Sequence, residues 1–364
     1  MRIGIYAPNL RTSAPTGVER AVEELLRALA ALGSGHDFVL LSDAADLARS
    51  PRWRHVPVPS MGWLRRLRYD HRLLARAAAE ERLDLLHCTK SFVPEGLACP
   101  AVVTVYDVIF LKRPEFYPWW WRGYWRRALE RSVARARTVV CISETTARDL
   151  EDAVPAARGK TAAVPCGVDA RRFAEPGRPP VEGPYFLWVG TVTARKNLDG
   201  LLDALGTLGE GAPPLVVAGG VDPHAGHGRR LEAAAAAGKL RFLRRVGDAE
   251  LPGLYAGATA LVYPSLYEGF GLPVLEAMAS GCPVIASRAG AIPEAAGEAG
   301  LLVEPGDRAA LAQAMRRVAG EPELRRELAR RGRARAAELS WARTAERTLE
   351  VYERLGRHET AARA

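Results

Sequence analysis

The stretch PSLYEGFGLPVLEAMASGCPVIAS, residues 264–287, decides how the C-terminal half of the chain is interpreted. Apolar runs stand at both of its ends, and Glu268 lies between them, directly before Gly-Phe-Gly. A helix is predicted to begin at Leu272, because Pro273 then occupies the first helical turn, where proline is tolerated. Gly281, a favoured residue after a helix C-terminus, marks its end. The stretch therefore predicts a strand, a glycine-rich loop, a helix and a second strand.

The start of this helix is suited to binding a ligand. Its first N–H groups, approached through two glycines, form a natural site for an anion or for sugar hydroxyl groups. Glu276 stands one turn further in, about 6 Å along the helix axis, so Glu268 and Glu276 are aimed at one ligand. A phosphate would repel both carboxylates, and hydroxyl groups are their expected partners. The alternative is that both are solvated surface residues, because their spacing alone is a weak signal.

Outward from this stretch, apolar runs alternate with helical patterns along the whole chain. Such continuous runs are typical of parallel strands buried on both faces. They lie at 2–7, 38–41, 84–88, 101–107 and 138–143, and again at 185–190, 214–220, 240–247, 260–265 and 283–287. The sequence therefore predicts an α/β protein with two doubly wound domains of similar size.

A break separates the two series of strands. Residues 167–184 hold three glycines and four prolines without apolar periodicity, which predicts an interdomain linker. We place the first domain at 1–170 and the second at 171–340. A last helical pattern, 341–355, follows Ser340, a suitable N-cap residue.

The composition of the 364-residue chain is 48% hydrophobic and 26% charged, which excludes a disordered chain, a collagen-like chain and a disulfide-stapled scaffold. The net charge is +9, and 46 of the 51 basic residues are arginines. This arginine content reflects either a GC-rich genome or a surface that attracts nucleotides, phosphates or acidic lipid.

The five cysteines are widely spaced and include no C-x-x-C pair, which argues against a disulfide framework and a structural zinc site. A reducing cytoplasm fits this pattern. The N-terminal apolar run is too short for a signal-peptide core, and no stretch reaches the ~18–20 apolar residues of a membrane span. We expect a cytoplasmic protein, either soluble or peripheral on the inner face of the membrane.

Several nucleotide and metal motifs are missing. The first strand is not followed by G-x-G-x-x-G, and the P-loop-like end at 159–161 fails because position 154 is valine. Neither Asp-x-Asp nor H-E-x-x-H occurs. We therefore expect no metal and no cofactor.

The stretch 264–287 resembles the donor-binding segment of retaining glycosyltransferases of family 4 (glycosyl transferases group 1), most closely mannosyltransferase-like members. The resemblance covers nearly the whole chain and includes GTVTARKNLDGLLDAL (190–205), CISETTARDL (141–150), PCGVDARRF (165–173) and GDAELPGLYAGATALVYPS (247–265). It implies the GT-B fold, in which two Rossmann-like domains face each other across a cleft. The first domain is expected to bind the acceptor and the second the donor, with the helix at about 341–364 packing back on the first.

The resemblance also implies roles for single residues. Glu276 is expected to hold the ribose hydroxyl groups of a nucleotide, and Glu268 the transferred sugar. Further donor contacts are expected from Gly17, Val246, Phe270, Gly271 and Leu272. At Gly17 the loop backbone would approach the donor phosphate, which a residue without Cβ permits; the alternative is a simple glycine at a helix start.

Arg195 and Lys196 are expected to bind the diphosphate and, with Glu268, to carry the catalysis. Departure of a nucleoside diphosphate from an anomeric carbon builds negative charge on the phosphates, which a guanidinium and an ammonium stabilise without a metal. The alternative is a solvated basic pair at a helix start, which the helix dipole disfavours.

One position departs from the family pattern. In the segment 102–118 relatives usually carry a His-Asp pair at the strand end, whereas this chain has Tyr106 and Asp107. Both are expected to contact the acceptor. Tyr106 can donate a hydrogen bond, but it cannot shuttle protons at neutral pH as histidine does, which puts the acceptor geometry and the activity itself in question.

The segment 116–137 interleaves four tryptophans with arginines. A basic aromatic helix lies on an anionic membrane surface or stacks on sugar rings; the alternative is a buried helix with exposed arginines. The rest of the chain offers no motif for nucleic acid.

The sequence thus favours a retaining glycosyltransferase that moves a sugar, mannose-like by resemblance, from a GDP- or UDP-linked donor to a saccharide or lipid-linked saccharide. Two alternatives remain open: a catalytically silent scaffold that binds nucleotide-sugar, and an enzyme acting on a small natural-product acceptor. A phosphorylase with pyridoxal phosphate is disfavoured, because only five lysines are present and Lys196 is already assigned.

Overall fold

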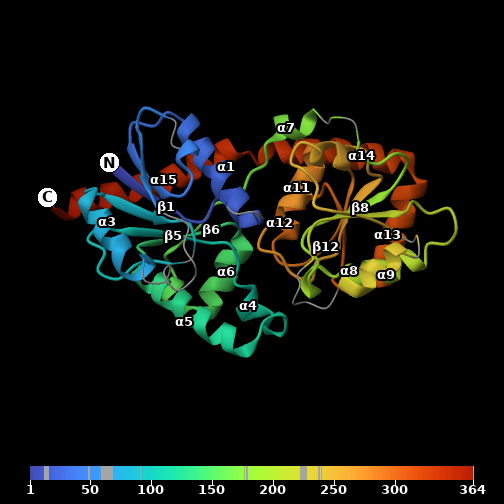
Figure 1. Ribbon diagram of the computed structural model, residues 1–364, viewed down its shortest axis with the longest axis horizontal. Coiled ribbons are helices and arrows are strands. Elements are labelled where there is room, and N and C mark those ends of the chain that lie inside the picture. The colour runs from blue at the N-terminus through green and yellow to red at the C-terminus, as the bar shows by residue number, and fades with distance from the viewer. Residues whose placement is uncertain are drawn as a thin grey trace. The chain divides into compact units, whose positions relative to one another are not determined.

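The computed structural model of the protein divides into two compact units, one formed by residues 1–166 with 341–364 and the other by 167–340 (Figure 1). The chain crosses between them after Cys166, where the sequence placed the boundary at 170, and again after Ser340. The structure describes residues 1–11, 16–47, 50–58, 69–90, 92–175, 177, 179–221, 228–236, 238 and 240–363.

The described part of the first unit is built on a sheet of seven parallel strands in the order β3-β2-β1-β4-β5-β6-β7. Their bounds are Arg2–Ala7 (β1), Asp37–Ser42 (β2), Trp53–Pro57 (β3), Leu85–Cys88 (β4), Ala101–Val105 (β5), Thr138–Cys141 (β6) and Thr161–Ala163 (β7). Ile3 on β1 is in register with Phe38 on β2 and with Leu85 on β4. The strand order therefore reverses direction between β1 and β4, where α/β folds bind ligands beyond the carboxyl ends of the strands.

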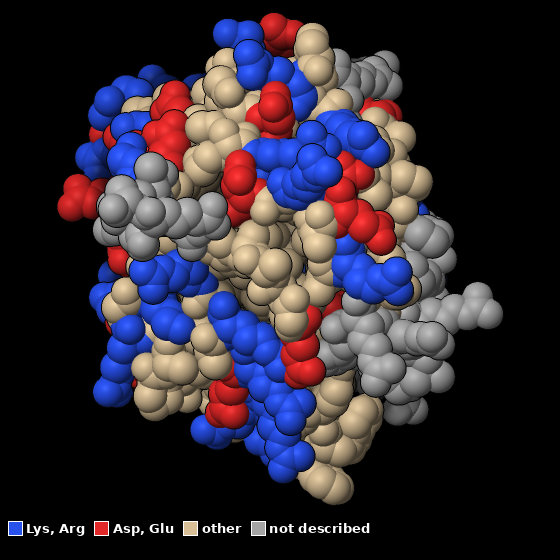
Figure 2. All heavy atoms as spheres, turned by 90° about the vertical axis from the view of Figure 1, so that its left-hand side faces the viewer, with Lys and Arg blue, Asp and Glu red and all other residues tan. Residues whose placement is uncertain are grey.

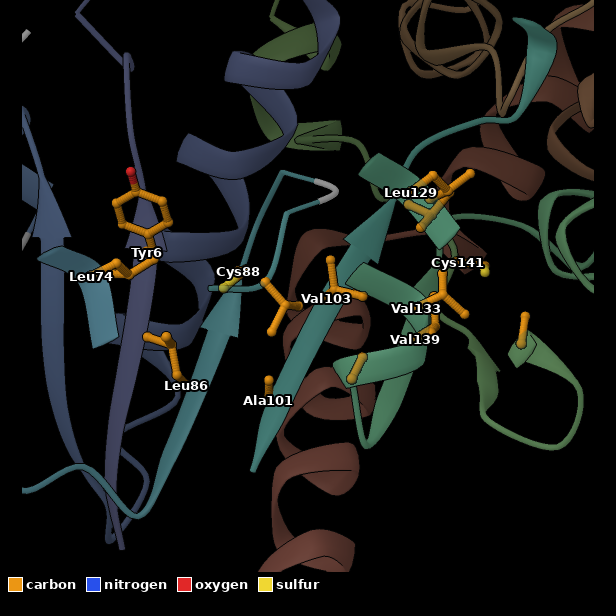
Figure 3. Close-up of a cluster of buried hydrophobic side chains, with 14 of the residues drawn as sticks. Tyr6, Leu74, Leu86, Cys88, Ala101, Val103, Leu129, Val133, Val139 and Cys141 are labelled. Atoms are coloured by element: carbon orange, nitrogen blue, oxygen red, sulfur yellow. The ribbon is translucent and has the colours of Figure 1, made fainter. Parts of the chain in front are cut away.

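Helices cover both faces of this sheet. They are α1 (Gly17–Ala31), α3 (Leu74–Glu80), α4 (Ile109–Lys112), α5 (Trp119–Arg135), α6 (Glu144–Ala153) and α15 (Trp341–Arg363). Leu129 and Val133 of α5 lie in one apolar cluster with Val103 and Val139 of the sheet (Figure 3). A second cluster joins the opposite face to α1 and α15. Burial of the strands on both faces explains their continuous apolar runs.

Hydrogen bonds among buried polar side chains connect the last helix to the sheet. The Tyr352 hydroxyl of α15 lies 2.5 Å from Nδ1 of His87 on β4, and Nε2 of His87 lies 2.7 Å from the hydroxyl of Thr104 on β5. All three side chains are buried. Burial lowers the pKa of His87 to about 3, because the charged imidazolium is poorly solvated there.

This network predicts a pH dependence of stability. The pKa of His87 is about 3 in the folded protein and 6.5 ordinarily, so on acidification the unfolded chain takes up a proton first. The free energy of unfolding therefore falls as pH drops below 6.5, by about 1.4 kcal/mol per pH unit. In the His87→Gln variant the free energy of unfolding should not fall in this way, because glutamine takes up no proton in this range. Urea unfolding of both proteins between pH 7 and pH 4 tests it, and parallel pH profiles would contradict it.

The described part of the second unit holds a sheet of six parallel strands in the order β10-β9-β8-β11-β12-β13. The strands are Phe186–Val189 (β8), Leu215–Ala218 (β9), Leu240–Arg244 (β10), Ala260–Tyr263 (β11), Val284–Ser287 (β12) and Leu301–Val303 (β13). Its helices are α7 (Ala170–Ala174), α8 (Leu198–Gly206), α9 (Gly228–Ala236), α10 (Leu251–Ala256), α11 (Leu272–Ala279), α12 (Ile292–Ala296), α13 (Arg308–Gly320) and α14 (Pro322–Glu338). The predicted class, an α/β protein with two parallel-sheet domains, is confirmed.

Some local expectations differ from the structure. The segment expected to be an irregular linker contains α7, whose Phe173 is buried within the second unit. The helical pattern at 63–82 begins, within the described residues, as a π-helical turn at Tyr69–Leu73 and continues as α3. No helix in the described part of the chain combines the length and apolar character needed to cross a bilayer.

Candidate active site

The site begins at the ends of β8 and β9, where two backbone segments meet closely. Gly219 has φ +142°, and a Cβ added there would lie 1.9 Å from the carbonyl oxygen of Gly190, so glycine is required. The Gly190 N–H donates to the Ala218 carbonyl at 3.0 Å. These close contacts hold in place the start of the loop that carries Arg195 and Lys196.

That loop is tied to the segment following β11. Arg195 and Lys196 lie in a 3-10 turn, Ala194–Lys196, which ends at Asn197 in the left-handed conformation. The Asn197 amide donates to the Pro264 carbonyl at 3.1 Å, and the Leu266 N–H donates to the Arg195 carbonyl at 2.8 Å. Both basic residues are thereby held against the stretch 264–268.

Glu268, Arg195 and Lys196 form one ion-pair cluster. Oε1 of Glu268 lies 2.7 Å from Nη1 of Arg195 and 2.7 Å from Nζ of Lys196. Arg195 also donates to the Tyr267 carbonyl at 2.9 Å, and Lys196 donates to the Tyr263 hydroxyl. Glu268 is only 7% exposed, so the interpretation of Glu268 as a solvated loop residue is wrong.

The charge state of the cluster follows from two opposing effects. Burial favours the protonated carboxyl, but the charges of Lys196 and Arg195 outweigh it and lower the pKa of Glu268 to about 2. Glu268 is therefore ionised at every ordinary pH. One carboxylate between two cations leaves the cluster with a net charge of +1, which attracts an anion.

Glu268→Gln is expected to destabilise the protein strongly, by about 3–5 kcal/mol at neutral pH, because two partly buried cations lose their buried counter-charge. The stabilisation by Glu268 is present above its ordinary pKa of 4.5 and is lost as pH falls toward about 2. Urea unfolding of both proteins from pH 7 to pH 2.5 measures the difference.

The matched control for this experiment is Glu304→Gln. Glu304 pairs with Arg288 in the same unit at 3.3 Å, but both side chains are more than half exposed, so the cost is about 1 kcal/mol or less. Equal losses in the two variants would show that the Glu268 cluster contributes no more than a surface ion pair.

A second glycine admits the backbone of Glu268. Gly290 has φ +54°, and a Cβ there would lie 2.3 Å from the Glu268 carbonyl oxygen. The same oxygen accepts a hydrogen bond from the Ala291 N–H at 2.9 Å. The loop after β12 thus holds the carboxylate-bearing loop in place.

The predicted helix is present as α11. Gly271, with φ +105°, precedes it in a left-handed conformation that favours glycine. Phe270 is buried, whereas Leu272 and Glu276 are half-buried. Oε2 of Glu276 accepts a hydrogen bond from the Tyr255 hydroxyl at 2.8 Å. Glu276 thus stands partly exposed, one turn inside the helix that directly follows the Glu268 loop.

The remaining candidate residues stand on other elements of the fold. Val246 is half-buried and follows the edge strand β10. Gly17 is the first residue of α1, and a Cβ there would meet nothing within 4 Å. Tyr106 and Asp107 follow β5; burial raises the pKa of Tyr106, and Asp107 accepts from the Ile109 N–H at 3.2 Å. These last three residues belong to the first unit.

Sequence reasoning missed the residues that support the charged groups. Tyr263, Asn197 and Gly290 contact the site, and Tyr255 contacts Glu276. A signal existed for Tyr263 alone, since it ends an apolar strand just before the candidate loop. Among the described residues, no three His, Cys, Asp or Glu side chains are grouped so that they could hold a metal ion.

Comparison with known proteins identifies the family of the chain. Residues 183–321 match the family model "Glycosyl transferases group 1", and residues 15–172 match "Glycosyltransferase Family 4". A relative, the O-antigen chain mannosyltransferase B of Escherichia coli, is 30% identical over 286 residues, 74% of each chain.

Solved structures show the same fold. Sucrose-phosphate synthase from Thermosynechococcus elongatus superposes with a TM-score of 0.79 at 23% identity, covering 98% of this chain and 99% of that one. Anabaena HepE in complex with UDP-glucose gives 0.76 at 17% identity, covering 97% and 99%. Two Rossmann-like units of this kind define the GT-B class of glycosyltransferases. Within that class, the chain belongs to glycosyltransferase family 4.

Proposed function

We propose that the protein transfers a hexose, with mannose the favoured sugar, from a nucleotide diphosphate donor to a saccharide or lipid-linked saccharide. In this proposal the anomeric configuration is retained, and the reaction uses neither a metal nor another cofactor. The observation that carries this proposal is the ion-pair cluster of Glu268, Arg195 and Lys196, in which two cations are held against the loop that precedes α11. The choice of mannose rests on the Escherichia coli relative.

The cluster suits departure of a diphosphate. When the bond between the anomeric carbon and the phosphate oxygen breaks, the electron pair stays on the phosphate, and Arg195 and Lys196 stabilise that charge. Because both cations are already held in place, little reorganisation accompanies the reaction.

The same geometry supports attack on the face that the phosphate leaves. Glu268 is poorly nucleophilic because two cations lie 2.7 Å from its oxygen. In our proposal the acceptor oxygen bonds to the anomeric carbon from that face, and its proton passes to the departing phosphate oxygen. Glu276 accepts hydrogen bonds from the ribose hydroxyl groups, and Tyr106 and Asp107 contact the acceptor.

The first test uses GDP, UDP, GDP-mannose and UDP-glucose in calorimetric titrations, with EDTA or with magnesium. At least one nucleotide is expected to bind equally in both conditions. Arg195→Ala and Lys196→Ala should weaken it about tenfold or more, since each removes a charged contact worth about 1.5–3 kcal/mol. Arg288→Ala, an exposed arginine of the same unit, is the control. Binding that EDTA abolishes and magnesium restores would contradict the proposal.

Turnover is then followed with the donor that binds and methyl α-mannoside as acceptor. An α-configured product, identified by NMR, supports retention, and a β-configured product contradicts it. If the protein binds the donor but transfers sugar to no saccharide, it is a catalytically silent scaffold that binds nucleotide-sugar. That alternative arises because Tyr106 stands where relatives usually carry histidine.

We further propose that the protein attaches peripherally to anionic membrane through the α5 aromatic surface, defined as Trp119, Trp120, Tyr124 and Trp125. These side chains are 78%, 63%, 46% and 40% exposed. Among the described residues, the other large hydrophobic side chain this exposed is Leu73. Aromatic rings of this kind favour the water–lipid boundary.

The charge of α5 matches an anionic lipid surface. The helix carries five arginines against one glutamate, and Arg126 and Arg127 are exposed next to the aromatic side chains. Figure 2 shows Lys and Arg side chains gathered in a band across the lower part of one face of the protein. Each basic residue near an anionic bilayer contributes about 1 kcal/mol.

Vesicle co-sedimentation tests the membrane proposal. Binding is expected to rise with the fraction of anionic lipid and to fall with salt. Changing Arg126 and Arg127 to Glu should abolish it, whereas the same change at Arg330 and Arg331 of α14 alters the net charge equally and should leave most binding intact. Equal binding to neutral and anionic vesicles, or equal loss in both variants, would contradict the proposal.

A further inference from the structure

A hydrogen bond from a buried tyrosine reaches the candidate ribose-binding carboxylate. Tyr255 of α10 is fully buried, and its hydroxyl donates to Oε2 of Glu276 at 2.8 Å. Glu276 itself is half-buried. A group without access to solvent therefore holds one oxygen of a carboxylate that a ligand can reach.

A second buried tyrosine in this unit uses a different kind of acceptor. Tyr185, equally buried in the same unit, donates its hydroxyl proton to the backbone carbonyl of Leu254 at 2.6 Å. Tyr255 instead donates its single proton to a side chain at the site. Its ring is held by Phe173 of α7, edge to face, with the ring centroids 6.0 Å apart.

The protonation state of Tyr255 supports a permanent donor. Burial, and then the neighbouring charge of Glu276, raise the pKa of Tyr255 far above its ordinary value. The phenol therefore keeps its proton wherever the protein is folded.

We propose that Tyr255 is a positioning residue for nucleotide recognition: it fixes the carboxylate of Glu276 in the orientation that accepts the ribose hydroxyl groups. This inference rests on the proposed function, in which Glu276 binds ribose. Fixing the carboxylate in advance removes an ordering cost that binding would otherwise bear. Tyr255 itself does not touch the ligand.

The test measures a preference for ribose hydroxyl groups. Calorimetry gives the dissociation constants of GDP or UDP, whichever binds, and of its 2′,3′-dideoxy analogue. The wild-type protein is expected to favour the ribonucleotide by about tenfold or more, and Glu276→Ala should abolish this preference.

Tyr255→Phe keeps the ring and removes only the hydroxyl. It should reduce the ribose preference by about three- to tenfold while leaving affinity for the dideoxy nucleotide unchanged. Tyr185→Phe, a matched loss of a buried hydroxyl, should leave the preference at its wild-type value. If Tyr255→Phe does not fold, Phe173→Leu, which loosens the ring, is measured in the same way and should also lower the preference.

The outcomes separate the two proposals. An unchanged preference in Tyr255→Phe, or equal weakening of both nucleotides, overturns the positioning role while Glu276→Ala still reports on ribose binding. If Glu276→Ala retains the preference, Glu276 does not bind ribose, and both the proposed donor site and the role of Tyr255 are wrong.

Discussion

A carboxylate enclosed between two cations is the constraint on which the second unit is organised. Glu268 is buried, so it is tolerated only because Arg195 and Lys196 approach it. The need is mutual, since two partly buried cations side by side would repel each other without it. The cluster therefore joins the loop after β8 to the loop after β11, and its geometry is fixed before any ligand arrives.

Close backbone contacts make this arrangement possible. At Gly219 and again at Gly290 a side chain would collide with a backbone oxygen, of Gly190 in the first case and of Glu268 in the second. The loops that follow four neighbouring strands, β9, β8, β11 and β12, thereby meet at the carboxyl ends of the strands. Hydrogen bonds between loops, such as that from Asn197 to Pro264, complete the support. Rigid loops of this kind hold charges where a preorganised site requires them.

Local rules predicted the elements around the site well, and long-range contacts explain what was missed. Pro273 and Gly281 bound α11 through backbone preferences that a sequence displays directly. The five-residue α7 carries no visible periodicity and is held by Phe173 packing on Tyr255. The strands β7 and β13 are three half-buried residues each, defined by pairing with a neighbour. The burial of Glu268 depends on partners far away along the chain.

The distribution of tryptophan has an experimental consequence. Of the eight tryptophans, Trp188 alone lies within 167–340, and it is fully buried on β8. Its indole ring lies beside Gly190, at the base of the loop that bears Lys196. Replacing the seven other tryptophans would leave a single tryptophan, which can be excited apart from the tyrosines, at the base of the loop that bears Arg195 and Lys196. Its emission would then follow the unfolding of the second unit and movements of this loop, without any added dye.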